Sequence, residues 1–268
     1  MIPALLLFGS IAPVAAADIP TIGSKLAPLE SSSLAAFLAE DAPAPLKHVW
    51  SGNVALGATY QDGNTDTRGV NANADAEYRG EDDRWTALGY WNYGDTKNQT
   101  SGEREINARK AGLGVKYDYF LSPKFYVFAN AGIETDLLAD IQRRTFVGAG
   151  AGYQWREDED LKWGSEVGAG YFTEDRYADE DKDYISARVA NNVDWKINEK
   201  SNLSNILALY PSLEDGDDIY GRSTTAFKTM LTEKMFLQIQ WIWDWDNTPS
   251  EGLARNDNTV TLGLGWSF

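Results

Sequence analysis

The sequence predicts an all-β fold, an antiparallel up-and-down transmembrane β-barrel of about 12 strands. Three observations predict it. Segments of alternating apolar and polar residues repeat from Trp50 to the end. Short connections between these segments alternate with connections that are mostly longer. The last segment has one wholly apolar face. Strands of an outer-membrane barrel show these features because one face meets lipid and the other meets the lumen.

The last segment, 258–268, carries the clearest alternation. Val260, Leu262, Leu264, Trp266 and Phe268 share one face of an extended strand, while small or polar residues occupy the other. A strand that closes a barrel against lipid requires such a face. The ending also resembles the signal that barrels present to their insertion machinery. We therefore expect Trp266 and Phe268 to be an assembly signal and the barrel-assembly machinery to be a partner.

The chain divides into three regions. Residues 1–17 combine an apolar run with Ala15-Ala-Ala17, which predicts a signal peptide, although no Lys or Arg precedes the run. Residues 18–49 are rich in Pro and Ser, which predicts a short periplasmic linker with one helix over 34–39. Residues 50–268 form the barrel. We expect the protein in the outer membrane of a Gram-negative cell, with both termini periplasmic.

The barrel strands are expected at positions set by the alternation and by turn residues. They are 50–60, 66–79, 84–95, 106–121, 125–136, 143–156, 161–174, 184–197, 202–211, 220–231, 235–246 and 258–268. Aromatic residues cluster beside the short turns, which predicts a girdle at one membrane interface.

Composition excludes several classes of function. The chain has no cysteine and a net charge of −16, so thiolate metal sites, disulfides and nucleic-acid binding are excluded. We expect no cofactor. The expected partners are outer-membrane lipid and lipopolysaccharide, and the expected state is a monomer.

The face opposite the lipid carries charges of both signs. The predicted lumen-lining residues are Asp75, Glu77, Lys110, Lys116, Glu134, Arg144, Arg156, Glu166, Arg188, Asp194, Lys196 and Asp244. Two interpretations remain: a hydrated channel with a transverse field, or a closed barrel filled by salt bridges. A barrel of about 12 strands lies between packed and open sizes, so size does not decide.

Lumen-phase glycines add a further pattern. They are Gly112, Gly114, Gly148, Gly150, Gly152, Gly164, Gly168 and Gly170. Glycine in a strand marks a bend or a close approach. Barrel curvature is the favoured explanation. The alternative is that part of 18–49 lies in the lumen as a plug.

Catalytic and metal motifs are weak. The single histidine, His48, lies in the linker, which favours an interfacial polar residue over a catalytic one; we expect no catalytic residue and no enzyme activity. Asp179, Asp181 and Asp183 resemble a calcium loop without its sixth-position Gly and twelfth-position acid. A solvated acidic loop is favoured, and loose Ca²⁺ or Mg²⁺ binding stays open.

Several motifs together resemble a known family. The turn Gly63-Asn-Thr-Asp66 and the segments 110–121, 130–134 and 148–153 resemble the YdiY-like, salt-induced outer-membrane protein family. The resemblance implies an outer-membrane barrel and supplies no mechanism. The leading expectation is a structural or narrow-channel barrel, linked to the envelope under osmotic stress. The alternatives are a lipid-acting hydrolase and a surface receptor or adhesin with acidic outer loops.

Overall fold

The computed structural model describes residues 49–61, 66–98 and 101–268. The predicted signal peptide, the linker with its helix over 34–39, His48 and most of the Gly63–Asp66 turn lie outside the described residues. Across the described part, no helix is long and apolar enough to cross a membrane.

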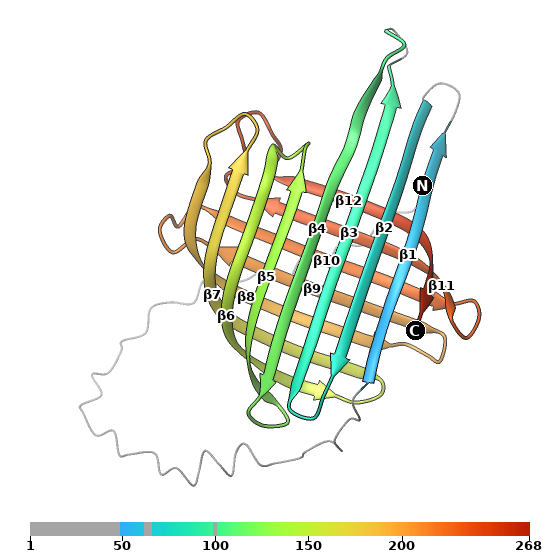
Figure 1. Cartoon of the computed structure of the whole chain (residues 1–268), viewed down its shortest axis with the longest axis vertical. Coiled ribbons are helices and arrows are strands. Elements are labelled where there is room, and N and C mark those ends of the chain that lie inside the picture. The colour runs from blue at the N-terminus through green and yellow to red at the C-terminus, as the bar shows by residue number, and fades with distance from the viewer. Residues whose placement is uncertain (1–48, 62–65, 99–100) are drawn as a thin grey trace, which may run out of the picture.

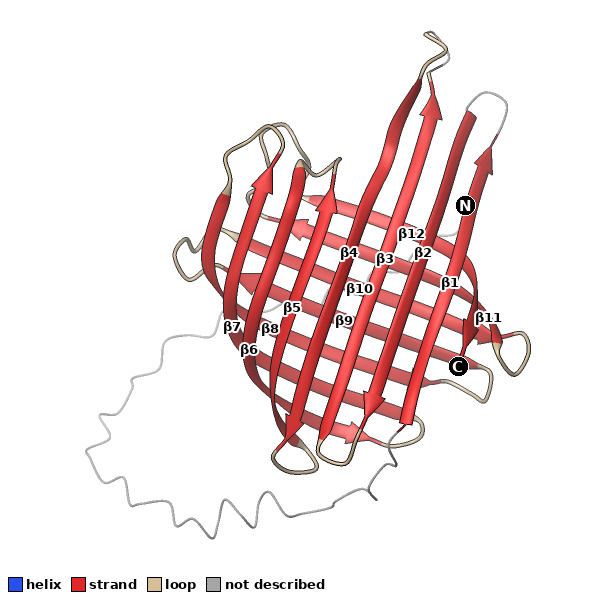
Figure 2. Cartoon of the chain, viewed as in Figure 1, coloured by secondary structure: helices blue, strands red, loops and turns tan. Residues whose placement is uncertain are grey.

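Twelve antiparallel strands form a closed barrel, in which each strand pairs with its sequence neighbours and the first pairs with the last (Figure 1). The strands are β1 (Val49–Gln61), β2 (Asp66–Arg79), β3 (Asp83–Lys97), β4 (Arg104–Phe120), β5 (Phe125–Asp136), β6 (Ile141–Glu157), β7 (Leu161–Arg176), β8 (Lys182–Lys196), β9 (Ser201–Pro211), β10 (Ile219–Met230), β11 (Met235–Asp246) and β12 (Asn256–Ser267). The drawn secondary structure is strand and loop throughout (Figure 2). The predicted fold class is confirmed, and the predicted strands differ from the observed ones only at their ends.

The two ends of the barrel differ in their connections. At the end we call the turn end, the strands are joined by turns of three or four residues, such as 80–82 and 121–124. At the opposite end, the loop end, the connections run from four residues (137–140) to nine (247–255). Strands β3 and β4 extend beyond their neighbours at the loop end (Figure 1).

The outer face of the barrel is apolar because each strand alternates between lipid and lumen. In β6, Val147 is 57% exposed while its neighbour Phe146 is 7% exposed. Leu56 and Leu262 are likewise exposed on their strands. This belt of aliphatic side chains has the chemistry of a surface that contacts hydrocarbon.

An aromatic girdle follows the turn end. Trp50 lies against Tyr78 with ring centroids 5.1 Å apart, and Trp85 lies against Tyr117 at 4.6 Å. Rings with an apolar body and a polar edge favour a membrane interface. The girdle therefore marks where one bilayer boundary crosses the barrel.

The β1–β12 seam closes the barrel over a short register. Four residue pairs join these strands, from Asn53–Ser267 to Leu56–Leu264. Beyond them, the backbone N–H of Phe268 donates to the carbonyl of Gly52, and the N–H of Gly52 donates back, both at 3.1 Å. A Cβ on Gly52 would lie 2.5 Å from the Phe268 ring, so the glycine makes room for it.

Arg156, which the sequence predicts to line the lumen, lies on the outer face. Arg156 has an exposed side chain, ion-paired with Asp158. A β-bulge between Gln154 and Arg156 shifts the register against β7, and Arg156 pairs with the outward-facing Trp163. The prediction was wrong because a bulge inserts one residue and reverses the alternation beyond it.

The assignment of faces predicts unequal costs for arginine at adjacent positions. Ile239 is 48% exposed on the outer face in mid-β11, and Gln240 points inward. We expect Ile239→Arg to lower the free energy of unfolding by about 2–4 kcal/mol and Gln240→Arg to lower it much less. Reversible urea unfolding in lipid vesicles measures both, and equal losses would contradict the assigned phase of β11.

Candidate functional site

Six side chains from six strands meet across the lumen near the loop end. This transverse layer consists of Tyr90 (β3), Lys110 (β4), Glu134 (β5), Arg144 (β6), Arg222 (β10) and Asp244 (β11). Lys110 Nζ lies 2.6 Å from Asp244 Oδ2, and Arg222 Nη1 lies 2.6 Å from Glu134 Oε2. Because β4 and β11, like β5 and β10, lie nearly opposite in the barrel order, these pairs span the lumen.

The layer is a connected network. Arg144 binds Glu134 at 2.9 Å and Glu174 at 2.6 Å, and its guanidinium lies 4.3 Å from the centre of the Tyr220 ring. Asp244 accepts hydrogen bonds from the Tyr220 hydroxyl at 2.8 Å and from Arg222 Nε at 2.5 Å. A buried charge is tolerated only when it is paired and hydrogen-bonded, and both residues satisfy that condition.

A second group of charges, the wall cluster, lies on the turn-end side of this layer against β4, β7 and β8. Glu166, which is 1% exposed, accepts from Lys116, from Arg188 Nη1 at 2.5 Å and from the Tyr126 hydroxyl at 2.8 Å. The Phe128 ring lies about 5.1 Å from both cationic groups. Three donors surround this carboxylate, as three also surround Glu134 and Asp244 in the transverse layer, so its charge is well compensated.

The remaining predicted lumen acids lie in more open surroundings. Asp75 is 3.6 Å from Lys228 across the lumen, and Glu77 is 3.6 Å from Lys162. Asp194 accepts a hydrogen bond from Asn202 at 2.8 Å and is exposed at the turn end. The structure therefore separates the predicted set into two tight clusters and a few weakly paired acids. Lys196, also predicted to line the lumen, is an exposed residue at the end of β8.

Sequence reasoning missed Arg222, Tyr90 and Glu174. All three occupy the inward phase of their strands. For Arg222 the register shows this directly, because it pairs with Asp244 and with Ala208, and Ala208 is buried. The alternation of β10, in which Phe227 is exposed to the outside, was the available signal for Arg222.

Water-sized space remains in the lumen on the turn-end side of the transverse layer. Leu88 on β3 and Ile206 on β9 face inward from opposite walls and are still 42% and 39% exposed. Gly114 pairs with Leu88, and a Cβ placed on it would meet only the Ala131 carbonyl, at 3.9 Å. Inward side chains can be exposed only where the lumen is unfilled, so we define this space as the inner chamber.

Aromatic rings cover most of the lumen glycines. A Cβ on Gly148 or Gly170 would lie 2.6 Å from the Phe146 ring, and one on Gly152 would clash with Tyr126. Rings that lie close over strand glycines account for the pattern in β6 and β7. The segment 18–49, the alternative occupant, lies outside the described residues.

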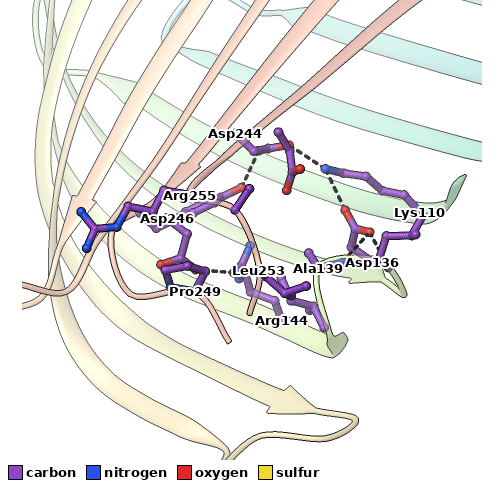
Figure 3. Close-up of a pocket in the computed structure, with 14 residues that line it drawn as sticks. Lys110, Asp136, Ala139, Arg144, Asp244, Asp246, Pro249, Leu253 and Arg255 are labelled. Carbon is purple, nitrogen blue, oxygen red and sulfur yellow. Dashed lines mark hydrogen bonds and ion pairs between the residues drawn. The ribbon is translucent and has the colours of Figure 1, made fainter. Parts of the chain in front are cut away.

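A cavity of about 120 Å³ lies on the loop-end side of the transverse layer. Its floor includes Lys110, which lies between Asp136 and Asp244, and its wall includes Leu253 and Pro249 from the β11–β12 loop (Figure 3). This outer cavity and the inner chamber are thus separated by one layer of side chains.

The acidic loop between β7 and β8 is held by arginine rather than gathered around a cation. Asp181 accepts the backbone N–H of Arg176 at 2.9 Å, Asp179 lies 3.3 Å from the Arg176 guanidinium, and Asp183 accepts from Tyr171. The backbone N–H of Glu180 holds the pKa of Asp179 below its usual value, and Arg176 adds to the effect. Within the ranges that the structure describes, no group of three or more His, Asp or Glu residues is placed to hold a metal ion.

Comparisons with known proteins agree with the resemblance found in the sequence. The uncharacterized protein YdiY of Escherichia coli (strain K12) is 24% identical over 238 residues, which cover 87% of this chain and 88% of that protein. Three solved barrels are similar at low identity. The NanC porin has a TM-score of 0.49 at 10% identity, covering 81% of this chain and 98% of its own. The translocator domain of the autotransporter NalP from Neisseria meningitidis has a TM-score of 0.43 at 11% identity, covering 88% of this chain and 93% of its own. The KdgM porin has a TM-score of 0.42 at 8% identity, covering 82% of this chain and 99% of its own.

The predicted resemblance to the YdiY-like family is confirmed by that relative and by a family model. The model described as "Protein of unknown function, DUF481" matches residues 54–268, which is the whole barrel apart from the first residues of β1. The chain therefore belongs to this family.

Proposed function

We propose that this protein is a narrow channel of the outer membrane whose tightest point is the transverse layer, and that it is not an enzyme. One observation carries the proposal: unfilled space lies on both sides of a layer of paired side chains. A barrel with a purely structural role gains nothing from an unfilled interior, because voids weaken packing.

The layer suits small hydrophilic solutes. Lys110 and Arg222 lie opposite Asp244 and Glu134, so a passing ion meets fixed charges of both signs at one level. Rings of charged side chains determine which ions pass a pore. In this proposal the turn end faces the periplasm and the loop end faces the exterior, beside lipopolysaccharide. The link to osmotic stress rests on the family resemblance and, like the hydrolase, receptor and monomer expectations, remains a prediction.

Planar-bilayer recording of the refolded full chain tests the channel. We expect discrete, low-conductance openings for the natural sequence and a severalfold larger conductance for Arg222→Ser. Removal of this guanidinium opens the layer and leaves Glu134 and Asp244 with fewer cationic partners, so selectivity shifts toward cations.

Arg143→Ser is the matched control. Arg143 is a 59%-exposed arginine paired with Asp175 outside the lumen, so its loss should leave conductance unchanged. Heat-modifiable migration on gels checks that each variant has folded. Silence of both the natural chain and Arg222→Ser would refute the channel and favour the structural role.

A further inference from the structure

Basic side chains gather on the outer face of β2, β3 and β4 near the loop end. We call Arg68, Lys97, Arg104 and Arg109 the basic strip. Register places Arg68 beside the outward Tyr60, and Arg109 beside the outward Tyr93. Both tyrosines are exposed, at 70% and 36%, so these arginines share the face that contacts lipid.

Arg68 and Arg109 of the strip lie at the same depth. Arg68 is ten residues from the girdle residue Tyr78 on β2, and Arg109 is ten residues from Tyr119 on β4. Ten residues at about 3.3 Å each, on strands tilted by about 40°, rise by about 25 Å, which is the height of the apolar band of such barrels. With the girdle at the periplasmic interface, both arginines reach the opposite interface, and Lys97 and Arg104 lie beyond it.

The charges of the strip are incompletely neutralised. Arg104 binds Asp66 at 2.6 Å and also Asp95, whereas Arg68 is 3.8 Å from Asp66 and has a 58%-exposed side chain. Arg109 is exposed and has no ion-pair partner among the residues that the structure describes. Among the described outward residues at this level, four bases stand against two acids, Asp66 and Asp95, which is a local positive excess on a chain whose net charge is −16.

The other side of the barrel differs at the same level. Outward positions near the loop end of β6, β7 and β8 hold Asp175 and Asp183 against one arginine, Arg143, which is paired with Asp175 at 2.5 Å. An anionic group in the outer leaflet is therefore drawn toward β2–β4 and away from β7–β8.

We propose that the basic strip binds the phosphate groups of a phosphorylated glycolipid of the outer leaflet, lipopolysaccharide. Guanidinium groups match phosphate oxygens with two parallel hydrogen bonds, and Tyr60 and Tyr93 give the sugar and the upper acyl chains a surface to pack on. The site rests on the proposed location in the outer membrane and does not depend on conduction.

The test measures lipopolysaccharide retained per protein after the refolded full chain is washed in detergent micelles. The natural chain should retain phosphorylated lipopolysaccharide and lose the enzymatically dephosphorylated form. Arg68→Gln with Arg109→Gln should lower retention about tenfold, since two charge-assisted contacts are lost. Raised salt should weaken retention by the natural chain.

Arg156→Gln is the matched control, because Arg156 is an exposed arginine of the outer face at the opposite boundary. Its retention should equal that of the natural chain. Equal retention of phosphorylated and dephosphorylated lipid by the natural chain overturns the proposal without any variant, as does an unchanged Arg68/Arg109 double variant. A silent channel with intact, phosphate-dependent retention would refute the conduction proposal alone, and cell fractionation outside the outer membrane would remove the premise of both.

Discussion

Replacement of Glu166 by glutamine is expected to lower the free energy of unfolding by about 3–5 kcal/mol. Glu166 is buried and neutralises Lys116 and Arg188, which both contact it directly. A neutral amide of the same shape leaves the buried Arg188 without its carboxylate partner and leaves Lys116 with Asp118 alone, and this uncompensated buried charge is the cause of the loss. Urea unfolding in vesicles, followed by tryptophan fluorescence, measures the change.

Glu77→Gln is the matched control for this prediction. It is the same substitution in the same lumen, but Glu77 is 32% exposed and lies 3.6 Å from a 46%-exposed Lys162, so water screens the pair. Its loss should stay below about 1 kcal/mol. Similar losses at both positions would show that the wall cluster is no drier than the surroundings of Glu77.

A compensating double variant distinguishes the stability lost through an unpaired buried charge from the stability lost through poorer packing. Glu166→Leu with Arg188→Met removes both members of the buried pair, while Lys116 keeps Asp118 at 2.6 Å. We expect this double variant to lose less stability than Glu166→Gln, because replacing a buried ion pair by apolar residues is often close to neutral. A double variant that is worse than the single one would assign the effect to packing around Phe128.

The strands were predictable because lipid and lumen impose a local alternation. Val147 next to Phe146, or Ile239 next to Gln240, shows the two environments within one dipeptide. The same local rule placed Lys110, Glu134, Arg144 and Asp244 on the inner face. It failed at Arg156, where the bulge adds a residue that no composition signal marks.

The contacts across the lumen were beyond sequence reasoning for a different reason. Whether Arg222 meets Glu134 depends on the stagger between strands that are five places apart in the barrel order, and small register shifts accumulate over those places. The coverage of Gly148 and Gly170 by the Phe146 ring depends on the same stagger. The sequence shows glycines and aromatics in the lumen phase without showing which ring lies over which glycine.

Deletion of Trp266, Ser267 and Phe268 is expected to prevent most of the protein from assembling. The seam between β1 and β12 has four residue pairs, whereas β1 and β2 share thirteen, and the deletion removes the pairs Asn53–Ser267 and Val54–Trp266. It also removes both backbone hydrogen bonds between Phe268 and Gly52.

An open seam would expose unpaired backbone groups to hydrocarbon, where each costs several kcal/mol. The control deletes three residues, 251–253, from the nine-residue β11–β12 loop, which leaves every strand intact and should permit assembly. Heat-modifiable migration and the amount of protein in the outer-membrane fraction measure the outcome. Because the seam is the shortest register in the barrel, its loss should stop closure even in vesicles without any insertion machinery. A truncated chain that refolds normally in those vesicles but fails to assemble in cells would instead show that these residues act only as a signal.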